Sequence, residues 1–324
     1  MLFSRNPAAL LAAFLACAAI APAAAQAYPD KPITVIVAFA PGGNVDATAR
    51  AIGPALSREL GQPVVIDNRG GAGGTIGSAL VARARPDGYT LMVGSTATNA
   101  TAPAFLKAPY DPVDSFTPIG GISITPSVVV VPPSTPAQTY AELVQLSKSR
   151  PSGLNMGSPG TGSLNHLTTE LLKEKTGLNA THIPYKGAGP ALSDLMGGQI
   201  DAMVDQISSS APFIASGRLR AVAQTGTHRS RLLPDVPTLR EQGVAGVDVA
   251  VYTGLFAPAG LPDAVRDTLV RALHAALRDP EVQTRLQAQG SEALDMTQEA
   301  FAGFVAEEAA RWRKVIETAG ISPE

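Results

Sequence analysis

The sequence predicts an α/β fold of two lobes, each built on a mainly parallel sheet, and three observations lead to this prediction. Short apolar runs alternate with helical segments of about 10–15 residues, which is the pattern of βαβ units. Glycines and prolines are spread along the chain between these runs and form no low-complexity block. Two stretches with apolar and proline residues, 119–133 and 247–262, have the character of connections between lobes.

The first residues, 1–27, have the features of an export signal. Arg5 supplies the positive start, residues 8–20 form the apolar core, and small residues follow as a cleavage site. The alternative is a membrane anchor, but the run is shorter than the roughly 20 residues of a span and Pro22 ends it. Cys17 lies inside the apolar core, which is a poor context for lipid attachment. We therefore expect a periplasmic protein from which the signal peptide is removed.

The elements that follow are read from periodicity and from their boundaries. Glycines such as Gly61 and Gly177 stand where helix C-caps are expected, and Pro262 and Pro280 stand where helices are expected to begin. The apolar runs predict strands at residues 34–39, 64–67, 89–94, 127–131, 154–156, 181–184, 200–204, 219–224 and 253–257. The periodic segments predict helices at residues 46–60, 75–84, 137–148, 163–175, 190–196, 262–278, 280–289 and 298–318.

Two connections between lobes imply that one lobe is inserted into the other. The inserted lobe is predicted at residues 124–250, and the discontinuous lobe at residues 28–123 plus 251–324. The last helix carries an apolar stripe that includes Phe301 and Trp312, so it is expected to pack on a lobe, and its pattern leaves open which one.

Composition and charge exclude several classes of function. The formal net charge is −2, from 25 Lys and Arg against 27 Asp and Glu, and no basic run occurs, so nucleic acid is not an expected partner. Cys17 is the only cysteine, so the mature chain has no disulfide, no thiol nucleophile and no cysteine-ligated metal. The four histidines lack metal-binding spacing and no GxSxG occurs. We expect neither an enzyme nor a protein with a cofactor or metal.

The most informative motif is the strand, Pro-Gly-Gly turn and helix start within residues 34–50. The first N–H groups of a helix lack partners and lie at the positive end of the helix dipole, so such a turn favours an anion. The glycines Gly42 and Gly43 let the backbone approach a ligand closely. Asp46 has two interpretations, as the N-cap of the helix or as a ligand contact, and the first is favoured.

Residues 155–166, NMGSPGTGSLNH, repeat the same design in the second predicted lobe. If one turn lies in each lobe, the two helix N-termini can face one another across a cleft, and a bound anion bridges the lobes. Ser163 can cap the helix and can also donate its hydroxyl to a carboxylate. His166 lies one turn later, where a Ser–His pair is conceivable, although a packing or capping histidine is favoured because no orienting carboxylate is near in the sequence.

Three further features complete the candidate site. Asp205 ends a predicted strand, where ligands gather in open α/β sheets; it is read either as a contact to a ligand donor or as a satisfied surface carboxylate. The turns at 40–46, 95–99 and 157–165 contain no Lys or Arg, so a carboxylate there would be held by backbone N–H groups, hydroxyls and water. The glycine run at 70–77 lacks GxGxxG and GxxxxGK, which argues against a nucleotide site.

Taken in order, these motifs resemble a known family. The segments are YPDKPITVIVAFAPGGNVDATAR, VVIDNRGGAGGTIGS, RPDGYTLMVGS, YDPVDSFTPIG, HIPYKGAGPALSDLMGGQIDAM, RLRAVAQTG…RLLPDVPTLREQG and GLFAPAGLP, and together they resemble the Bug family of periplasmic receptors of tripartite tricarboxylate transporters. The resemblance implies a type II periplasmic-binding-protein flytrap that closes on a dicarboxylate, tricarboxylate, amino acid or aromatic acid. Two departures are visible: Gly71 stands where the family often has Pro, and Tyr252 where many members have Trp, which is expected to alter the cleft wall.

The family's binding loops transfer to this sequence residue by residue. The resemblance implies ligand-binding roles for Phe39, Ala40, Gly42, Gly43, Asp46, Ser95, Thr96, Ala97, Ser158, Thr161, Gly162, Ser163, His166 and Asp205. The leading hypothesis is a monomeric solute-binding receptor that captures a small carboxylate and delivers it to the membrane subunits of such a transporter. Two alternatives stay open, an exported enzyme that acts on small carboxylates in the same cleft and a sensory module for a membrane kinase.

Overall fold

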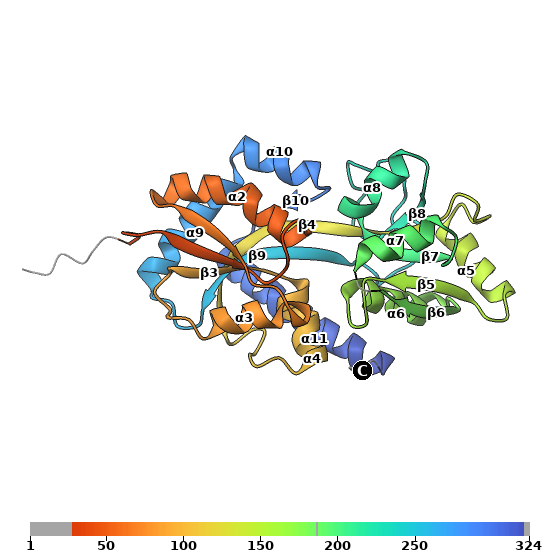
Figure 1. The fold of residues 1–324 in the computed structure, drawn as a ribbon, viewed down its shortest axis with the longest axis horizontal. Coiled ribbons are helices and arrows are strands. Elements are labelled where there is room, and N and C mark those ends of the chain that lie inside the picture. Colours follow the sequence, from red (N-terminus) through yellow and green to blue (C-terminus); the bar gives the residue numbers. More distant parts are fainter. Residues whose placement is uncertain (1–27, 186, 321–324) are drawn as a thin grey trace, which may run out of the picture.

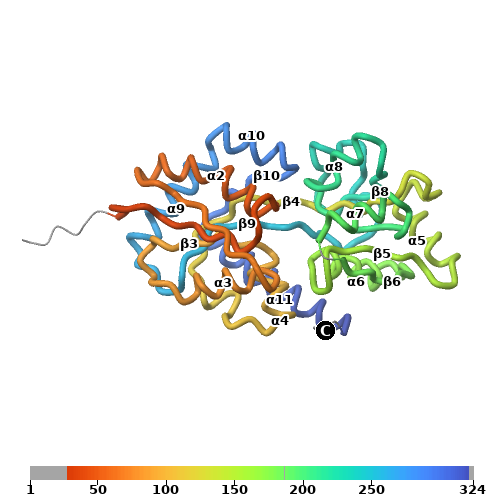
Figure 2. The backbone as a smooth tube through the Cα atoms, in the orientation of Figure 1, coloured from red at the N-terminus to blue at the C-terminus, as the bar shows by residue number. Residues whose placement is uncertain are grey.

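The computed structural model describes residues 28–185 and 187–320, which form two lobes lying side by side (Figures 1 and 2). The predicted export signal, residues 1–27, lies outside the described residues. No helix in the described part of the chain is long and apolar enough to cross a membrane. The strands are β1 (Ile33–Val37), β2 (Val64–Asn68), β3 (Thr90–Ser95), β4 (Phe116–Val131), β5 (Leu154–Ser158), β6 (Ala180–Pro184), β7 (Ala202–Gln206), β8 (Arg220–Gln224), β9 (Ala250–Pro258) and β10 (Glu292–Ala293).

Each lobe contains a block of three parallel strands, which confirms the predicted fold class. In the first lobe β1 pairs with β2 and β3, and in the second lobe β5 pairs with β6 and β7. The sequence did not indicate that antiparallel strands join these blocks into one sheet of order β2-β1-β3-β9-β4-β7-β5-β6, with β8 and β10 also paired to β4.

The long strand β4 carries the chain from one lobe to the other (Figure 2). Its first part, from Phe116 to Pro126, pairs with β9 in the first lobe, and its last part, from Ser127 onwards, pairs with β7 and β8 in the second. The segment 119–133, predicted as a connection between lobes, is therefore largely part of a strand that runs through both lobes. The exact lobe boundaries given above stay a prediction.

The helices cover both faces of the sheet (Figure 1). Every predicted helix is present, and Gly61 and Gly177 end α2 and α6 in the left-handed conformation, with φ of 64° and 66°. The short helices α4 and α8 and strand β10 were not predicted, since α4 has five residues and α8 contains Pro212. The helices are α2 (Asn44–Leu60), α3 (Thr75–Ala82), α4 (Ala102–Leu106), α5 (Tyr140–Ser149), α6 (Leu164–Thr176), α7 (Ala188–Met196), α8 (Ile207–Ala215), α9 (Asp263–Leu277), α10 (Pro280–Ala288) and α11 (Gln298–Ala319), with η2 (Ala72–Gly74) and the π-helical turn η3 (Ala97–Thr101).

The last helix, α11, packs on both lobes. Phe301 and Val305, in its first half, belong to the aromatic cluster of the first lobe that contains Tyr252. Trp312 and Ile316, in its second half, belong to the main apolar cluster of the second lobe. The apolar stripe of this helix, whose partner lobe the sequence left open, therefore contacts the first lobe with its first half and the second lobe with its second half. Helix α11 thus forms a third connection between the lobes, besides β4 and β9.

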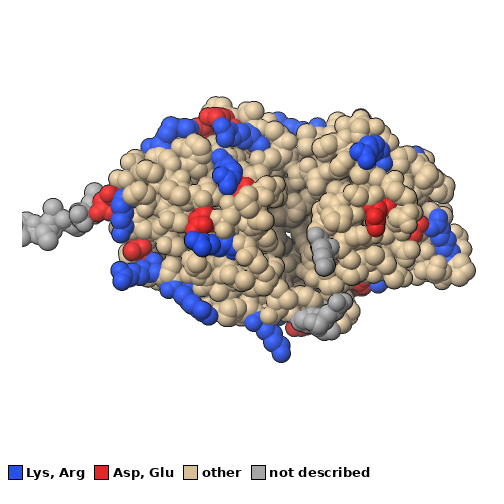
Figure 3. Space-filling view, in the orientation of Figure 1, with Lys and Arg blue, Asp and Glu red and all other residues tan. Residues whose placement is uncertain are grey.

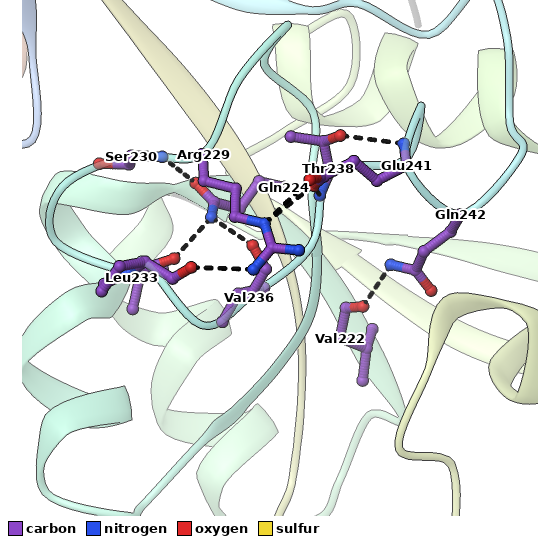
Figure 4. Close-up of polar contacts among 10 residues, drawn as sticks. Val222, Gln224, Arg229, Ser230, Leu233, Val236, Thr238, Glu241 and Gln242 are labelled. Carbon is purple, nitrogen blue, oxygen red and sulfur yellow. Dashed lines mark hydrogen bonds and ion pairs between the residues drawn. The ribbon is translucent and has the colours of Figure 1, made fainter.

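After β8 the second lobe contains a long irregular stretch that is fixed by side chains (Figure 4). The fully buried amide of Gln224 donates to the carbonyls of Leu233 and Val236, at 2.8 and 2.7 Å, and accepts the N–H of Ser230 at 2.9 Å. Arg229 pairs with Glu241 at 3.0 Å. Because a buried amide without partners is costly, these bonds give the irregular backbone one defined path.

Candidate ligand-binding site

A cavity of about 390 Å³ lies between the two lobes, and the space-filling view shows the furrow that separates them (Figure 3). Its first-lobe wall is formed by the start of α2, by the turn that joins β3 to η3, and by α4. Its second-lobe wall is formed by the segment from Pro159 to Asn165 and by Gln206 at the end of β7. Both glycine turns that the sequence singled out therefore reach one cavity, one from each lobe.

The wall of this cavity carries no charge. Among the described residues that line it there is no Lys, Arg, His, Asp or Glu. Its polar groups are Ser, Thr, Asn and Gln side chains and backbone, and its apolar groups include Phe39, Phe105 and Leu106. The electrostatic preference of the cavity is consequently set by the N-termini of α2 and α6, both of which favour an anion.

A second cavity, of about 250 Å³, lies on the opposite face of the crossing strands. Successive residues of a strand point to opposite faces, and Ala250 lines this second cavity whereas Val251 lines the first. Its wall contains the carboxylates of Asp248, Glu292 and Glu308 together with Arg311 and His228, so it lacks the uncharged character of the first cavity. In the described part of the chain no group of three or more His, Cys, Asp or Glu side chains could hold a metal ion.

The α2 wall is shaped by Asp46, although not as the sequence predicted. The helix begins at Asn44 with Gly43 as its N-cap, and no side chain caps it, so Asp46 is the third helical residue and not the N-cap. Its carboxylate accepts the N–H of Gly42 at 2.9 Å and also binds Arg50 and Asn68, both at 2.9 Å. Asp46 is buried and does not line the cavity.

The electrostatics of Asp46 match this structural role. Burial alone would raise the pKa of its carboxyl, but the hydrogen bonds from Arg50, Gly42 and Asn68 outweigh burial and hold the pKa below its usual value. The carboxylate is therefore charged at neutral pH and fixes the Pro-Gly-Gly turn. Of the other residues predicted in this turn, Phe39 and Gly43 line the cavity, whereas Ala40 and Gly42 do not.

The α6 wall has the predicted turn and N-cap, but two of the residues predicted to bind the ligand do not line the cavity. Ser163 is the N-cap, and its Oγ accepts the backbone N–H of His166 at 3.3 Å. The Nδ1 of His166 accepts the N–H of Gly162 at 3.1 Å, which agrees with a capping histidine and gives no Ser–His side-chain pair. Thr161, Gly162 and Ser163 line the cavity, while Ser158 and His166 lie behind this loop.

The turn after β3 brings Ser95, Thr96 and Ala97 to the cavity. The Oγ1 of Thr96 accepts the N–H of Tyr252 at 3.0 Å, which ties the turn to β9. The Oγ of Ser95 is buried and has no hydrogen-bond partner among the described residues, and the same holds for the Oδ1 of Asn44. An unpaired buried polar atom costs about 1–3 kcal/mol, so these two atoms mark places where a polar ligand would bind favourably.

Two sequence interpretations of β7 and β9 need correction. Asp205 neither lines the cavity nor lies at the surface: it is buried, accepts the hydroxyls of Ser209 and Ser210, and burial raises the pKa of its carboxyl. Its neighbour Gln206 lines the cavity instead. Tyr252 is not part of the cleft wall, because it points to the opposite face and packs in the aromatic cluster of the first lobe.

Several lining residues were not predicted from the sequence. Asn44 follows the glycine turn directly and could have been found by extending the turn by one residue. Phe105 and Leu106 lie on the unpredicted helix α4, and Gln206 was passed over in favour of the acidic residue beside it. No local signal marks Val251, which reaches the cavity only through the pairing of β9 with β4.

Comparison with known proteins now decides the family. The model of the tripartite tricarboxylate transporter family receptor matches residues 48–321. The chain belongs to this receptor family. It is 36% identical to protein BugT of Bordetella pertussis over 315 residues, which is 96% of this chain and 97% of BugT. The resemblance to the Bug family is thereby confirmed.

Two solved structures of receptor relatives share the fold. MatC from Rhodopseudomonas palustris, with bound malate, is 36% identical, with a TM-score of 0.77 over 89% of this chain and 100% of MatC. The R. palustris protein Rpa4515, with adipate, is also 36% identical, with a TM-score of 0.81 over 92% of this chain and 100% of that protein. The family is thus one of transporter receptors, and these two relatives hold malate and adipate as bound ligands.

Proposed function

We propose that this protein is a periplasmic receptor that binds a small carboxylate between its lobes and delivers it to the membrane subunits of a tripartite tricarboxylate transporter. The observation that carries the proposal is the uncharged cavity onto which the N-termini of α2 and α6 open from opposite lobes. MatC with malate and Rpa4515 with adipate support a carboxylate as the ligand. Dicarboxylates, tricarboxylates, amino acids and aromatic acids belong to the proposed class.

The proposed ligand contacts come from both lobes. Backbone N–H groups at Gly43 and Asn44 and the hydroxyl of Ser95 hold one end of the ligand, and the Thr161–Ser163 turn holds the other. A ligand that contacts both walls binds better when the lobes are close, so it shifts them toward closure by as much as its preference for the closed state allows. The receptor works as a monomer after removal of residues 1–27.

A carboxylate ligand is expected to raise the melting temperature. Binding to the native state alone adds about 2.7 kcal/mol of stability when the ligand is at 100 times its Kd. Differential scanning fluorimetry with malate, adipate, citrate, glutamate and benzoate, each at 10 mM, measures this shift, and the uncharged diamide of adipate is the matched control. The absence of a shift with every acid, together with no heat in titration calorimetry, contradicts the proposal.

Ser163→Ala is expected to weaken carboxylate binding by about tenfold or more. The variant loses a hydroxyl donor to a charged group, worth about 1.5–3 kcal/mol, and an N-cap bond that costs about 1 kcal/mol of fold stability. Calorimetric Kd values and urea unfolding separate the two losses. Thr139→Ala is the matched control, because Thr139 caps α5 by accepting the N–H of Glu142 at 3.2 Å and lies outside the cavity. Equal affinities of wild type and Ser163→Ala would remove this hydroxyl from the site.

A further inference from the structure

Two histidines form a stacked pair behind the second-lobe wall of the cavity. His166 lies in the first turn of α6 and His182 lies in β6, and their rings stack at 3.6 Å between centroids with 9° between their planes. His182 was not predicted as a functional residue, and neither ring lines the cavity. The pair stands directly behind the loop 158–163, which forms the cavity wall.

Each ring is bonded to this loop. The Nδ1 of His166 accepts the N–H of Gly162 at 3.1 Å, so the ring proton lies on Nε2. The Nε2 of His182 lies 2.6 Å from the Oγ of Ser158, which in turn lies 3.1 Å from the carbonyl oxygen of Gly160 and 3.2 Å from its nitrogen. Gly160 and Gly162 both line the cavity, so the stacked pair fixes the backbone at two points of the wall.

The loop also contacts the opposite lobe. Gly162 has a φ of +75°, and a Cβ built on it would lie 2.5 Å from Phe105 in α4, so the two are in close contact across the cavity. A displacement of Gly162 therefore changes the cavity wall and the contact between the lobes together.

We propose that the stacked pair of His166 and His182 positions the ligand-binding loop while both rings are neutral, and that protonation of His166 displaces the loop and weakens ligand binding. The proposal rests on the carboxylate-binding function proposed above. Protonation of His166 places a second N–H at Nδ1, where it faces the N–H of Gly162, and two donors cannot share one bond. A charge on one ring also opposes a charge on the other at 3.6 Å.

Burial, helped by the charge of Lys173, keeps the pair neutral at ordinary pH. The carboxylate of Glu170 lies 3.8 Å from the Nε2 of His166, but it is paired with Lys173 at 2.9 Å. Burial, followed by the charge of Lys173, lowers the pKa of His166 to about 4. Burial and the charges of His166 and Lys173 also lower the pKa of His182 to about 4. The charge of Glu170 raises this pKa, but its effect is smaller.

The lowered pKa values of the two histidines also predict how the stability of the fold depends on pH. Both folded pKa values lie below the ordinary value of 6.5, so the unfolded chain binds more protons than the folded one between these values. The contribution of the neutral pair is full above pH 6.5 and is lost as the pH falls toward 4. The urea midpoint of the wild type is expected to fall more steeply over this range than that of a variant in which the pair cannot titrate.

Two variants remove the titration and keep the geometry. In His166→Asn the amide oxygen replaces Nδ1 as acceptor for Gly162, and in His182→Gln the amide replaces Nε2 toward Ser158. The probes are malate and adipate, with Kd measured by calorimetry at pH 6.5 and 3.5. The ratio of the two Kd values is compared between proteins, so that titration of the acid itself cancels. His274→Asn is the matched control, since His274 pairs with Asp295 and lies outside the cavity.

We expect the Kd of the wild type and of His274→Asn to rise at least threefold more between these pH values than the Kd of the protein that carries both His166→Asn and His182→Gln. Amide signals of ¹⁵N-glycine-labelled ligand-free protein report the loop directly, and those of Gly160 and Gly162 should shift with the histidine titration in the wild type and in His274→Asn only. The proposal is wrong if the rings titrate while both amides stay unchanged, or if all variants give the same Kd ratio. If the two amide signals shift with the histidine titration but the protein binds neither acid at pH 6.5, the loop mechanism is supported and the carboxylate function is contradicted.

Discussion

Replacing Gly43 by valine is expected to weaken carboxylate binding by about 10- to 100-fold and to leave the fold intact. Gly43 has φ of −81° and ψ of 172°, which is extended backbone that valine adopts readily. A Cβ at this position meets only the carbonyl oxygen of Ala40, at 4.0 Å. Its side chain would therefore occupy open space at the N-terminus of α2, where the proposed ligand meets the backbone. Loss of hydrogen bonds to a charged group costs about 1.5–3 kcal/mol, which corresponds to this loss of affinity.

Calorimetry with malate and adipate measures the loss, and urea unfolding followed by circular dichroism checks the fold. Gly189→Val is the matched control, because Gly189 lies in the first turn of α7, also has no neighbour within 4 Å of its Cβ, and lies outside the cavity. A Gly43→Val protein that keeps wild-type affinity would mean that the ligand does not approach the N-terminus of α2. A lowered urea midpoint in Gly43→Val alone would mean that the turn has a structural role that its open surroundings do not indicate.

The paired helix starts were predictable from the sequence because their chemistry is local. A helix N-terminus needs a turn, a cap and an apolar period, and these signals lie within a few residues of each other. Gly43 and Ser163 were identified in this way, and they line one cavity. That the two turns meet depends on the lobe arrangement, which followed from the inferred connections and from the family resemblance.

The direction of a side chain was less predictable than its position. Asp46 and Asp205 were both placed at the site by sequence, and both are buried behind the wall, where they bind backbone or hydroxyl groups. Tyr252 was expected to face the cleft. Strand β9 is buried on both faces, so its residues do not alternate between apolar and polar, and the sequence does not show which of them face the cavity. Only the pairing of β9 with β4 settles it.

Three contacts between distant segments were not predicted from the sequence. Phe105 reaches the cavity from a five-residue helix without a periodic pattern, and His182 stacks on His166 because β6 pairs with β5 beside α6. The packing of α11 on both lobes could likewise be seen only in the structure. Its apolar stripe is continuous, and nothing in the sequence indicates that its two halves contact different lobes.

Replacing Trp312 by alanine is expected to lower the free energy of unfolding by about 3–5 kcal/mol, as for other buried aromatic residues. Trp312 is fully buried in the apolar cluster of the second lobe, and its Nε1 donates to the Oε2 of Glu308 at 3.0 Å. Urea unfolding followed by circular dichroism measures the loss. Trp312→Phe is the control that keeps a large ring and removes the hydrogen bond to the Glu308 carboxylate, and it should cost about 1.5–3 kcal/mol, less than alanine.

The effect should extend beyond the second lobe because α11 also packs on the first. Phe301 and Val305 hold the beginning of the helix in the first-lobe cluster, so loosening its end removes one of three connections between the lobes. Trp312 is the only tryptophan, and its fluorescence in the wild type therefore reports the end of α11 alone. If α11 couples the lobes, fluorescence and circular dichroism give coincident unfolding transitions in the wild type. A fluorescence transition at lower urea, together with a loss below about 1 kcal/mol in Trp312→Ala, would show that the helix end detaches independently and does not connect the lobes.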